Sequence, residues 1–329
     1  KAAARAAVPG SPERATHEAM SAAMKLVINS AYGYLGAGGL TRFADVHAAN
    51  EVTRRGREVL DTMCTALAAR GVQLLEADTD GVYFAVPESW SPDDERRIVA
   101  EVAALLPPLV QLEHDGRYAA MLSHEPKNYA LLTYDGELIL RGVAFRSSRA
   151  EPYGEAFLRR AIHALLTGDV PGVRAAYLSS ISALRRRELP TFDVSSRVRL
   201  TRTPADYLAL RDTRRELPYE AMLSAGRTAW TPGERARVYR TRGGGAGLVP
   251  DREDDESETA AIDPRDYDSD HYERVLRDSF ASRLARAFTP DDHAAVFADP
   301  DQLEMFAKPL SAITPVLKGA DTTSPRSPD

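Results

Sequence analysis

The spacing of apolar residues predicts both helices and strands in this chain. Apolar positions recur at helical intervals over residues 18–35, 92–112 and 151–189, which predicts a helical conformation in each segment. Residues 74–84 instead form the pattern of a strand, a tight turn closed by an Asp-Gly step, and a returning strand. A second strand–turn–strand pattern is centred on Tyr134-Asp135-Gly136. Helices and strands are therefore expected to share the chain.

The predicted helices each have one apolar side, which indicates the surface that they bury. These sides comprise Leu60, Met63 and Leu67; Val99, Val102, Leu105, Leu106 and Leu109; and Phe157, Leu158, Ile162, Leu165 and Leu166.

The later part of the chain is less regular. Residues 235–240 are predicted to form a polar strand, and residues 243–257 are Gly-rich and then acidic, which is typical of a mobile loop. After about residue 300 the chain is rich in Pro, Ser and Thr, which favours a disordered tail.

The composition is that of a globular protein without disulfides. The 329 residues are 43% apolar, enough for two or three packed units. No segment resembles a signal peptide or a membrane span, and Cys64 is the only cysteine, which excludes disulfides and thiolate zinc sites. A reducing cytoplasm is expected. Because the chain opens on Lys1 within helix-forming residues, we expect it to be part of a longer protein.

The net charge of −6 conceals a basic block. Residues 141–242 contain 20 Arg against 10 Asp and Glu, a local balance of +10, whereas residues 251–258 are strongly acidic. An Arg-rich block of this length is the footprint expected for a polyanion partner. The alternative is an ordinary set of solvated helices, which also carry surplus charge.

Two carboxylates, Asp78 and Asp80, occupy the tip of the first predicted hairpin. Nearby carboxylates repel each other, and a divalent cation such as Mg²⁺ with oxygen ligands removes that conflict. Alternate residues of a strand share a face, so both side chains are expected to point the same way while Thr79 points away. The alternative is a surface turn that is rich in turn-forming Asp.

Lys25, Asn29 and Tyr32 lie at positions i, i+4 and i+7 of the first predicted helix, which is expected to end at Gly33. A cation, an amide and an aromatic ring on one stripe suit a nucleoside triphosphate: the lysine for the phosphates, the ring for the base or sugar. An exposed helix with ordinary surface residues is the alternative.

Four motifs in order resemble family B DNA polymerases. Residues 25–33 are similar to the fingers-helix signature Lys-x-x-x-Asn-Ser-x-Tyr-Gly, and residues 52–57 to the Val-Thr-x-x-Gly-Arg helix of the same family. The Asp-Thr-Asp hairpin follows, and then Lys127-Asn128-Tyr129 matches a Lys-x-Tyr element. One departure is Glu76-Ala77, where family members often carry Tyr-Gly.

The resemblance implies an α+β fold, the C-terminal part of a right-hand polymerase. Its parts would be the end of the fingers (residues 1–40), an antiparallel palm sheet with packed helices (41–146), a mostly helical thumb (147–300) and a flexible tail (301–329). The implied function is DNA-directed DNA polymerase, in which a nucleotidyl group is transferred to a primer 3′-hydroxyl by a two-metal mechanism.

The resemblance also implies site residues and partners. Asp80 and Asp78 would bind two Mg²⁺ ions, completed by an aspartate outside this chain. The remaining roles are catalysis by Asp80, Asp78 and Lys25; deoxynucleoside triphosphate binding by Lys25, Asn29, Tyr32 and Thr79; and primer–template DNA binding by Lys127, Tyr129, Arg141, Arg146 and Arg149.

Neither the family's first metal-binding aspartate nor its 3′→5′ exonuclease domain is found in this sequence. We therefore expect the chain alone to be inactive. Two alternatives stay open: a non-catalytic DNA-binding remnant of a polymerase, and, more remotely, an Asp-x-Asp glycosyltransferase.

Residues 302–306, Gln-Leu-Glu-Met-Phe, resemble the short peptide by which bacterial polymerases bind the sliding clamp. Gln302 would offer an amide, while Leu303, Met305 and Phe306 would be apolar anchors. The alternative is that Leu303 and Phe306 pack a final helix on the thumb. This resemblance implies a bacterial, polymerase II-like enzyme in the cytoplasm, associated with the nucleoid and not with a membrane.

Overall fold

The computed structural model describes residues 2–78, 81–249, 263–301 and 308–316. They fall into two compact units, one ending at His114 and the other beginning at Asp115. This division lies inside the segment predicted as palm, and the names fingers, palm and thumb stay predictions. Within the described ranges no helix is long and apolar enough to cross a membrane.

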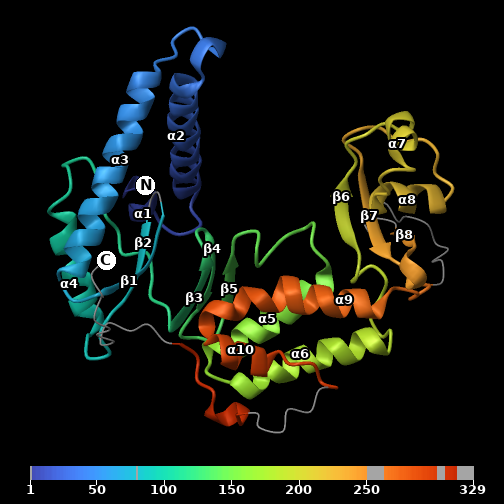
Figure 1. Ribbon diagram of the computed structural model, residues 1–329. Coiled ribbons are helices and arrows are strands. Elements are labelled where there is room, and N and C mark those ends of the chain that lie inside the picture. The colour runs from blue at the N-terminus through green and yellow to red at the C-terminus, as the bar shows by residue number, and fades with distance from the viewer. Residues whose placement is uncertain (1, 79–80, 250–262, 302–307, 317–329) are drawn as a thin grey trace, which may run out of the picture. The chain divides into compact units, whose positions relative to one another are not determined.

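The first unit contains two long helices, a two-stranded hairpin and a shorter helix (Figure 1). In chain order its elements are α1 (Ala2–Ala6), α2 (Pro12–Gly36), the 3-10 turn η1 (Gly38–Leu40), α3 (Val46–Ala68), β1 (Gln73–Asp78), β2 (Gly81–Ala85) and α4 (Pro92–Ala103).

Helix α2 begins earlier than predicted, at Pro12 rather than at Glu18, and continues past its predicted end. The Ser11 side chain accepts a hydrogen bond from the Arg14 backbone N–H, and Pro12 occupies the first turn. The helix runs through Gly33 to Gly36, so the predicted end at Gly33 is wrong. A glycine inside a helix costs only about 1 kcal/mol relative to alanine, too little to break the helix.

Helix α4 is shorter than predicted. It ends at Ala103, and the side chains of Leu105 and Leu109 are 55% and 97% exposed. Pro107 and Pro108 explain the difference, because the residue before a proline is disfavoured in the helical conformation. Other residues of the apolar sides predicted for α3 and α4 are buried, namely Met63, Leu67, Val99, Val102 and Leu106.

Strands β1 and β2 pair antiparallel and confirm the first predicted hairpin. Asp78 is opposite Gly81, and a bulge interrupts the register between Leu74 and Glu76. Gly81, which follows the predicted turn, is the first residue of β2.

The second unit contains two three-stranded antiparallel sheets and most of the remaining helices (Figure 1). Its first sheet has the order β3-β4-β5. Its strands are β3 (Ala120–Glu125), β4 (Asn128–Leu132) and β5 (Leu138–Arg141). The helices that share a core with it are α5 (Pro152–Leu166), α6 (Val170–Arg185), α9 (Ser269–Val275), the π-helical turn η3 (Leu276–Phe280), the 3-10 helix η4 (Ala281–Ala287) and α10 (Pro290–Val296).

One hydrophobic core joins this sheet to the helices, with Leu122 and Ala130 from the strands, and Phe157, Ile162 and Phe280 from the helices. The segment predicted as helical over residues 151–189 is two helices, α5 and α6. They are separated at Gly168, whose φ of 78° is outside the helical region. The second predicted hairpin is confirmed by the β4–β5 pairing.

The other sheet of this unit has the order β6-β7-β8 and its own small core. Its elements are β6 (Ser196–Arg199), β7 (Arg235–Arg240) and β8 (Ala246–Val249), with α7 (Pro204–Leu210), α8 (Leu217–Ser224) and the 3-10 turn η2 (Arg242–Gly244). The segment predicted as a mobile loop from residue 243 therefore contains strand β8, which pairs with β7.

The described residues near the C-terminus pack on the second unit rather than forming part of a flexible tail. Ile313, beside the 3-10 turn η5 (Leu310–Ala312), is buried at 3% exposure. The Val316 N–H donates to the Ala287 carbonyl at 2.8 Å, and Lys308 pairs with Asp292 at 2.9 Å. Residues 302–306, the predicted clamp-binding peptide, lie outside the described residues.

Candidate functional site

The predicted metal site can be placed only through Asp78. This residue ends β1 and is half-buried, while Thr79 and Asp80 lie outside the described residues. The Asp78 carboxylate has the hard oxygen ligands that Mg²⁺ prefers, so this residue fits the expected ion. Across the described ranges, no group of three or more His, Cys, Asp or Glu side chains is arranged to hold a metal.

The predicted nucleotide-binding stripe lies on α2, a helix with no buried residue among those described. Lys25 and Asn29 are exposed, and Tyr32 is 45% exposed. The Tyr32 hydroxyl is 2.8 Å from the Thr53 hydroxyl on α3. Since Thr53 donates its single hydroxyl hydrogen to the Ala49 carbonyl at 3.1 Å, Tyr32 is the donor in this contact.

This hydrogen bond connects two of the sequence motifs. Tyr32 belongs to the Lys-x-x-x-Asn-Ser-x-Tyr-Gly signature, and Thr53 belongs to the Val-Thr-x-x-Gly-Arg helix. It engages the tyrosine hydroxyl and leaves part of the ring exposed, so the ring is accessible for stacking. The role of Thr53 in orienting Tyr32 was not predicted. In the sequence, only the presence of a threonine on the next predicted helix indicates this role.

The start of α3 carries a second set of polar contacts. Glu51 accepts hydrogen bonds from Arg54 and Arg55, both at 2.7 Å. These two guanidinium groups lower the pKa of Glu51 to about 2, with Arg54 the larger cause. The Arg54 side chain is therefore paired with a residue of its own helix.

The second unit brings together part of the predicted DNA-binding set. Lys127 lies in the connection between β3 and β4 with a φ of 67°, and Tyr129 and Arg141 are register partners on β4 and β5. The three residues therefore share one end of the sheet. Lys127 and Arg141 are exposed and Tyr129 is half-buried.

Asn128 holds this end of the sheet in place. Its side-chain amide N–H donates to the Pro126 carbonyl at 3.0 Å, and its amide oxygen accepts from the Ala144 N–H at 2.9 Å. At Gly142, whose φ is 84°, an added Cβ would overlap the Lys127 carbonyl oxygen and Asn128. Asn128 and Gly142 therefore hold the Lys127–Arg141 end of the sheet in place. In the sequence, only the residue types Asn and Gly at these two positions indicate this role.

Arg146 and Arg149 lie in the connection after β5 and are exposed. The Arg146 N–H donates to the Gly142 carbonyl at 3.1 Å, which places Arg146 directly after the Lys127–Arg141 end of the sheet. The Arg149 carbonyl instead accepts from the Arg197 N–H of β6 at 3.0 Å. The predicted residues therefore line the sheet end and the connection that leaves it.

Comparison with known proteins identifies the family. The model of DNA polymerase family B matches residues 6–216. DNA polymerase 1 of Pyrococcus abyssi is 33% identical over 124 residues, which are 37% of this chain and 16% of that protein. The DNA polymerase of Thermococcus sp. (strain 9oN-7) is 27% identical over 192 residues, 57% of this chain and 25% of that protein.

A solved structure shows the same fold. The family B DNA polymerase from the hyperthermophilic archaeon Pyrobaculum calidifontis superposes with a TM-score of 0.58 at 19% identity, over 92% of this chain and 36% of that one. The α+β fold predicted from the sequence is confirmed by this likeness. The chain thus spans about a third or less of the proteins that it matches. Since the family model covers well over half of its residues, this chain belongs to DNA polymerase family B.

Proposed function

We propose that this chain supplies the end of the fingers, part of the palm and the thumb of a DNA-directed DNA polymerase. The observation that carries the proposal is the Tyr32–Thr53 hydrogen bond, which joins two family motifs in the unit that also contains the Asp78 hairpin. The substrates would be primer–template DNA and deoxynucleoside triphosphates, and the product would be a primer extended by one nucleotide plus pyrophosphate.

Each predicted residue has a role in that reaction. Asp78 and Asp80 would hold Mg²⁺, which when bound supplies charge neutralisation at the attacking and leaving oxygens. Lys25 would neutralise the triphosphate and donate a proton to the departing pyrophosphate. Tyr32 would stack on the nucleotide, and Asn29 and Thr79 would orient it. These tasks are positioning and charge stabilisation, which dominate phosphoryl-type transfer.

The test is primer extension by a polymerase that combines this chain with a palm segment carrying the family's first aspartate. Magnesium-dependent extension of a primed template by the combination, and none by either part, is the expected result. Extension by neither part nor their combination would instead favour the alternative, a DNA-binding remnant without catalysis.

Replacing Lys25 with Ala should weaken triphosphate use much more than DNA binding, because Lys25 lies on the exposed stripe assigned to the incoming nucleotide. Losing one charge-assisted contact predicts a rise of about tenfold or more in the apparent triphosphate Kd. Single-turnover extension and gel-shift titration separate the two effects. The matched control is His17→Ala, two turns earlier on the same helix. Equal losses in both assays would mean that Lys25 contacts DNA or is structural.

Duplex DNA binding by the chain should fall steeply with salt. The Arg-rich block and the exposed Lys127, Arg141, Arg146 and Arg149 would contact phosphates, and each phosphate contact releases counterions. With about four such contacts, the affinity is expected to fall by roughly 100-fold between 50 and 200 mM salt. Fluorescence anisotropy with two unrelated duplexes measures this. A salt-independent affinity would contradict the proposed contacts.

We also propose that Gln302, Leu303, Met305 and Phe306 bind a bacterial sliding clamp, as in a polymerase II-like enzyme. A peptide spanning residues 299–309 is expected to bind such a clamp, and its Leu303→Ala/Phe306→Ala version about 100-fold more weakly, since both apolar anchors are lost. Calorimetric titration compares them. Indistinguishable curves would assign this segment to packing.

A further inference from the structure

The β1–β2 hairpin of the first unit has an apolar face and a polar face. The apolar face packs against the core that α3 and α4 supply (Figure 1), and its residues include Leu74, Val82 and Phe84. Tyr83 stands between two of these residues in β2, so it belongs to the other face. Its register partner is Glu76, and the pair of Asp78 and Gly81 follows two positions further along β1. Glu76 and Asp78 therefore lie together on the polar face.

A β-bulge brings Glu76 to this polar face. The register shifts by one residue between Leu74 and Glu76, so Leu75 is the extra residue of the bulge. In an unbroken strand, residues 74 and 76 would share a face, and Glu76 would lie beside Leu74 against the apolar core. The bulge instead keeps Leu74 in the core and places Glu76 with Asp78. Bulges often re-aim a side chain in this way, and they are frequent next to active sites.

The spacing of Glu76 and Asp78 suits a shared cation. Residues two apart on a strand are separated by about 6.5 Å between their Cα atoms. Both residues are half-buried, and partial removal from water strengthens the repulsion between two carboxylates. A divalent ion reverses this balance, because each carboxylate then attracts the same double positive charge.

Glu76 is also one of the two residues at which this chain departs from its family. Where family members often carry Tyr-Gly, this chain has Glu76-Ala77. A tyrosine at this position is neutral near pH 7, whereas a glutamate carries a negative charge and has only acceptor oxygens. The polar face of this hairpin therefore has one negative charge more than the family pattern supplies.

We propose that Glu76 is a further carboxylate of the metal site, which strengthens the binding of a divalent cation at Asp78. The inference rests on the proposed polymerase function, in which Asp78 holds Mg²⁺, and it adds one residue to that role. Carboxylate oxygens are ligands that suit both Mg²⁺ and Mn²⁺, so Mn²⁺ serves as a paramagnetic probe of the same site.

The test titrates Mn²⁺ into the full chain at constant ionic strength, and electron paramagnetic resonance measures the free ion. Glu76→Gln removes the charge and keeps the shape of the side chain. It should weaken Mn²⁺ binding by about fivefold or more, because one of the charges that attract the ion is lost. Glu76→Asp keeps the charge and should bind within about threefold of the unaltered chain.

The matched control is Glu88→Gln, which removes an exposed carboxylate beyond the end of β2 in the same unit. Since solvent and salt screen a charge at that position, this variant should bind Mn²⁺ within about twofold of the unaltered chain. A loss in Glu76→Asp as large as that in Glu76→Gln would assign Glu76 to packing rather than to charge, and would overturn the inference.

Asp78→Asn separates this inference from the proposed function. Weaker Mn²⁺ binding by Asp78→Asn, together with unchanged binding by Glu76→Gln, would overturn the role of Glu76 and leave the metal role of Asp78 intact. Binding that neither substitution changes, or no binding by the unaltered chain, would overturn both roles. Weaker binding by both variants, with Glu88→Gln unchanged, is the expected result.

Discussion

Replacing Asp80 with Ala in the complete polymerase is expected to lower nucleotide addition by at least roughly 1,000-fold, because a carboxylate that neutralises catalytic metal charge contributes several kcal/mol to the barrier. The overall fold and the duplex affinity should change little, since the substitution falls in the short connection between β1 and β2. Single-turnover extension with Mg²⁺ measures the rate, and anisotropy measures the affinity.

Asp135→Ala is the matched control for this experiment. Asp135 also precedes a glycine between two paired strands, but it lies in the β4–β5 connection and is exposed. A surface substitution of this kind should leave the extension rate within about twofold of the unaltered enzyme. Near-normal turnover after Asp80→Ala would remove this residue from the metal site.

Replacing Gly154 with Ala should strongly destabilise the second unit. Gly154 lies on α5 directly against the ring of Phe280, which is 1% exposed, and an added Cβ would overlap that ring. Overpacking of a rigid core predicts a loss of about 3 kcal/mol in the free energy of unfolding. Denaturant unfolding followed by the fluorescence of Trp230, in a Trp90→Phe background, reports on this unit alone.

A double-mutant cycle tests the cause of that loss. Phe280→Leu makes room beside Gly154, so Gly154→Ala should cost at least about 1 kcal/mol less in that background than in the unaltered chain. Additive effects of the two substitutions would mean that the helix, and not the Gly154–Phe280 contact, is responsible.

The elements that were predicted well are those whose signals are local. Both hairpins follow from apolar runs on either side of a short polar connection, and Gly136 has the positive φ of 82° that such a turn uses. The buried faces of α3 and α5 follow from helical spacing. Tyr32 was predicted as a site residue from its motif, whereas its contact with Thr53 is seen only in the structure.

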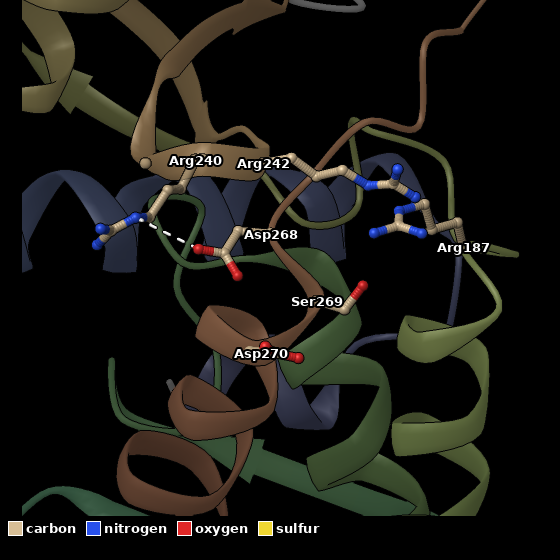
Figure 2. Close-up of a pocket in the computed structure, with 8 residues that line it drawn as sticks. Arg187, Arg240, Arg242, Asp268, Ser269 and Asp270 are labelled. Atoms are coloured by element: carbon tan, nitrogen blue, oxygen red, sulfur yellow. Dashed lines mark ion pairs between the residues drawn. The ribbon is translucent and has the colours of Figure 1, made fainter.

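The features that were predicted wrongly depend on contacts between distant parts of the chain, with one exception. Strand β8 is a short Gly-containing segment that becomes a strand because β7 pairs with it, and Ile313 is buried because the second unit supplies a core for it. The end of α4 was instead a local signal, Pro107-Pro108, that the apolar spacing outweighed. Arg187, Arg242 and Ser269 line one pocket of the second unit (Figure 2) although 55 and 27 positions separate them along the chain, so this pocket is visible only after folding.

Ion pairs on both sides of residues 302–307 connect the neighbouring chain to the second unit. Asp301 pairs with Arg185 at 2.8 Å and Lys308 with Asp292 at 2.9 Å, so six residues join two fixed points on the second unit. Any partner that binds residues 302–306 would therefore bind within a segment whose two neighbouring residues are paired with the second unit, and breaking either ion pair would release one of them.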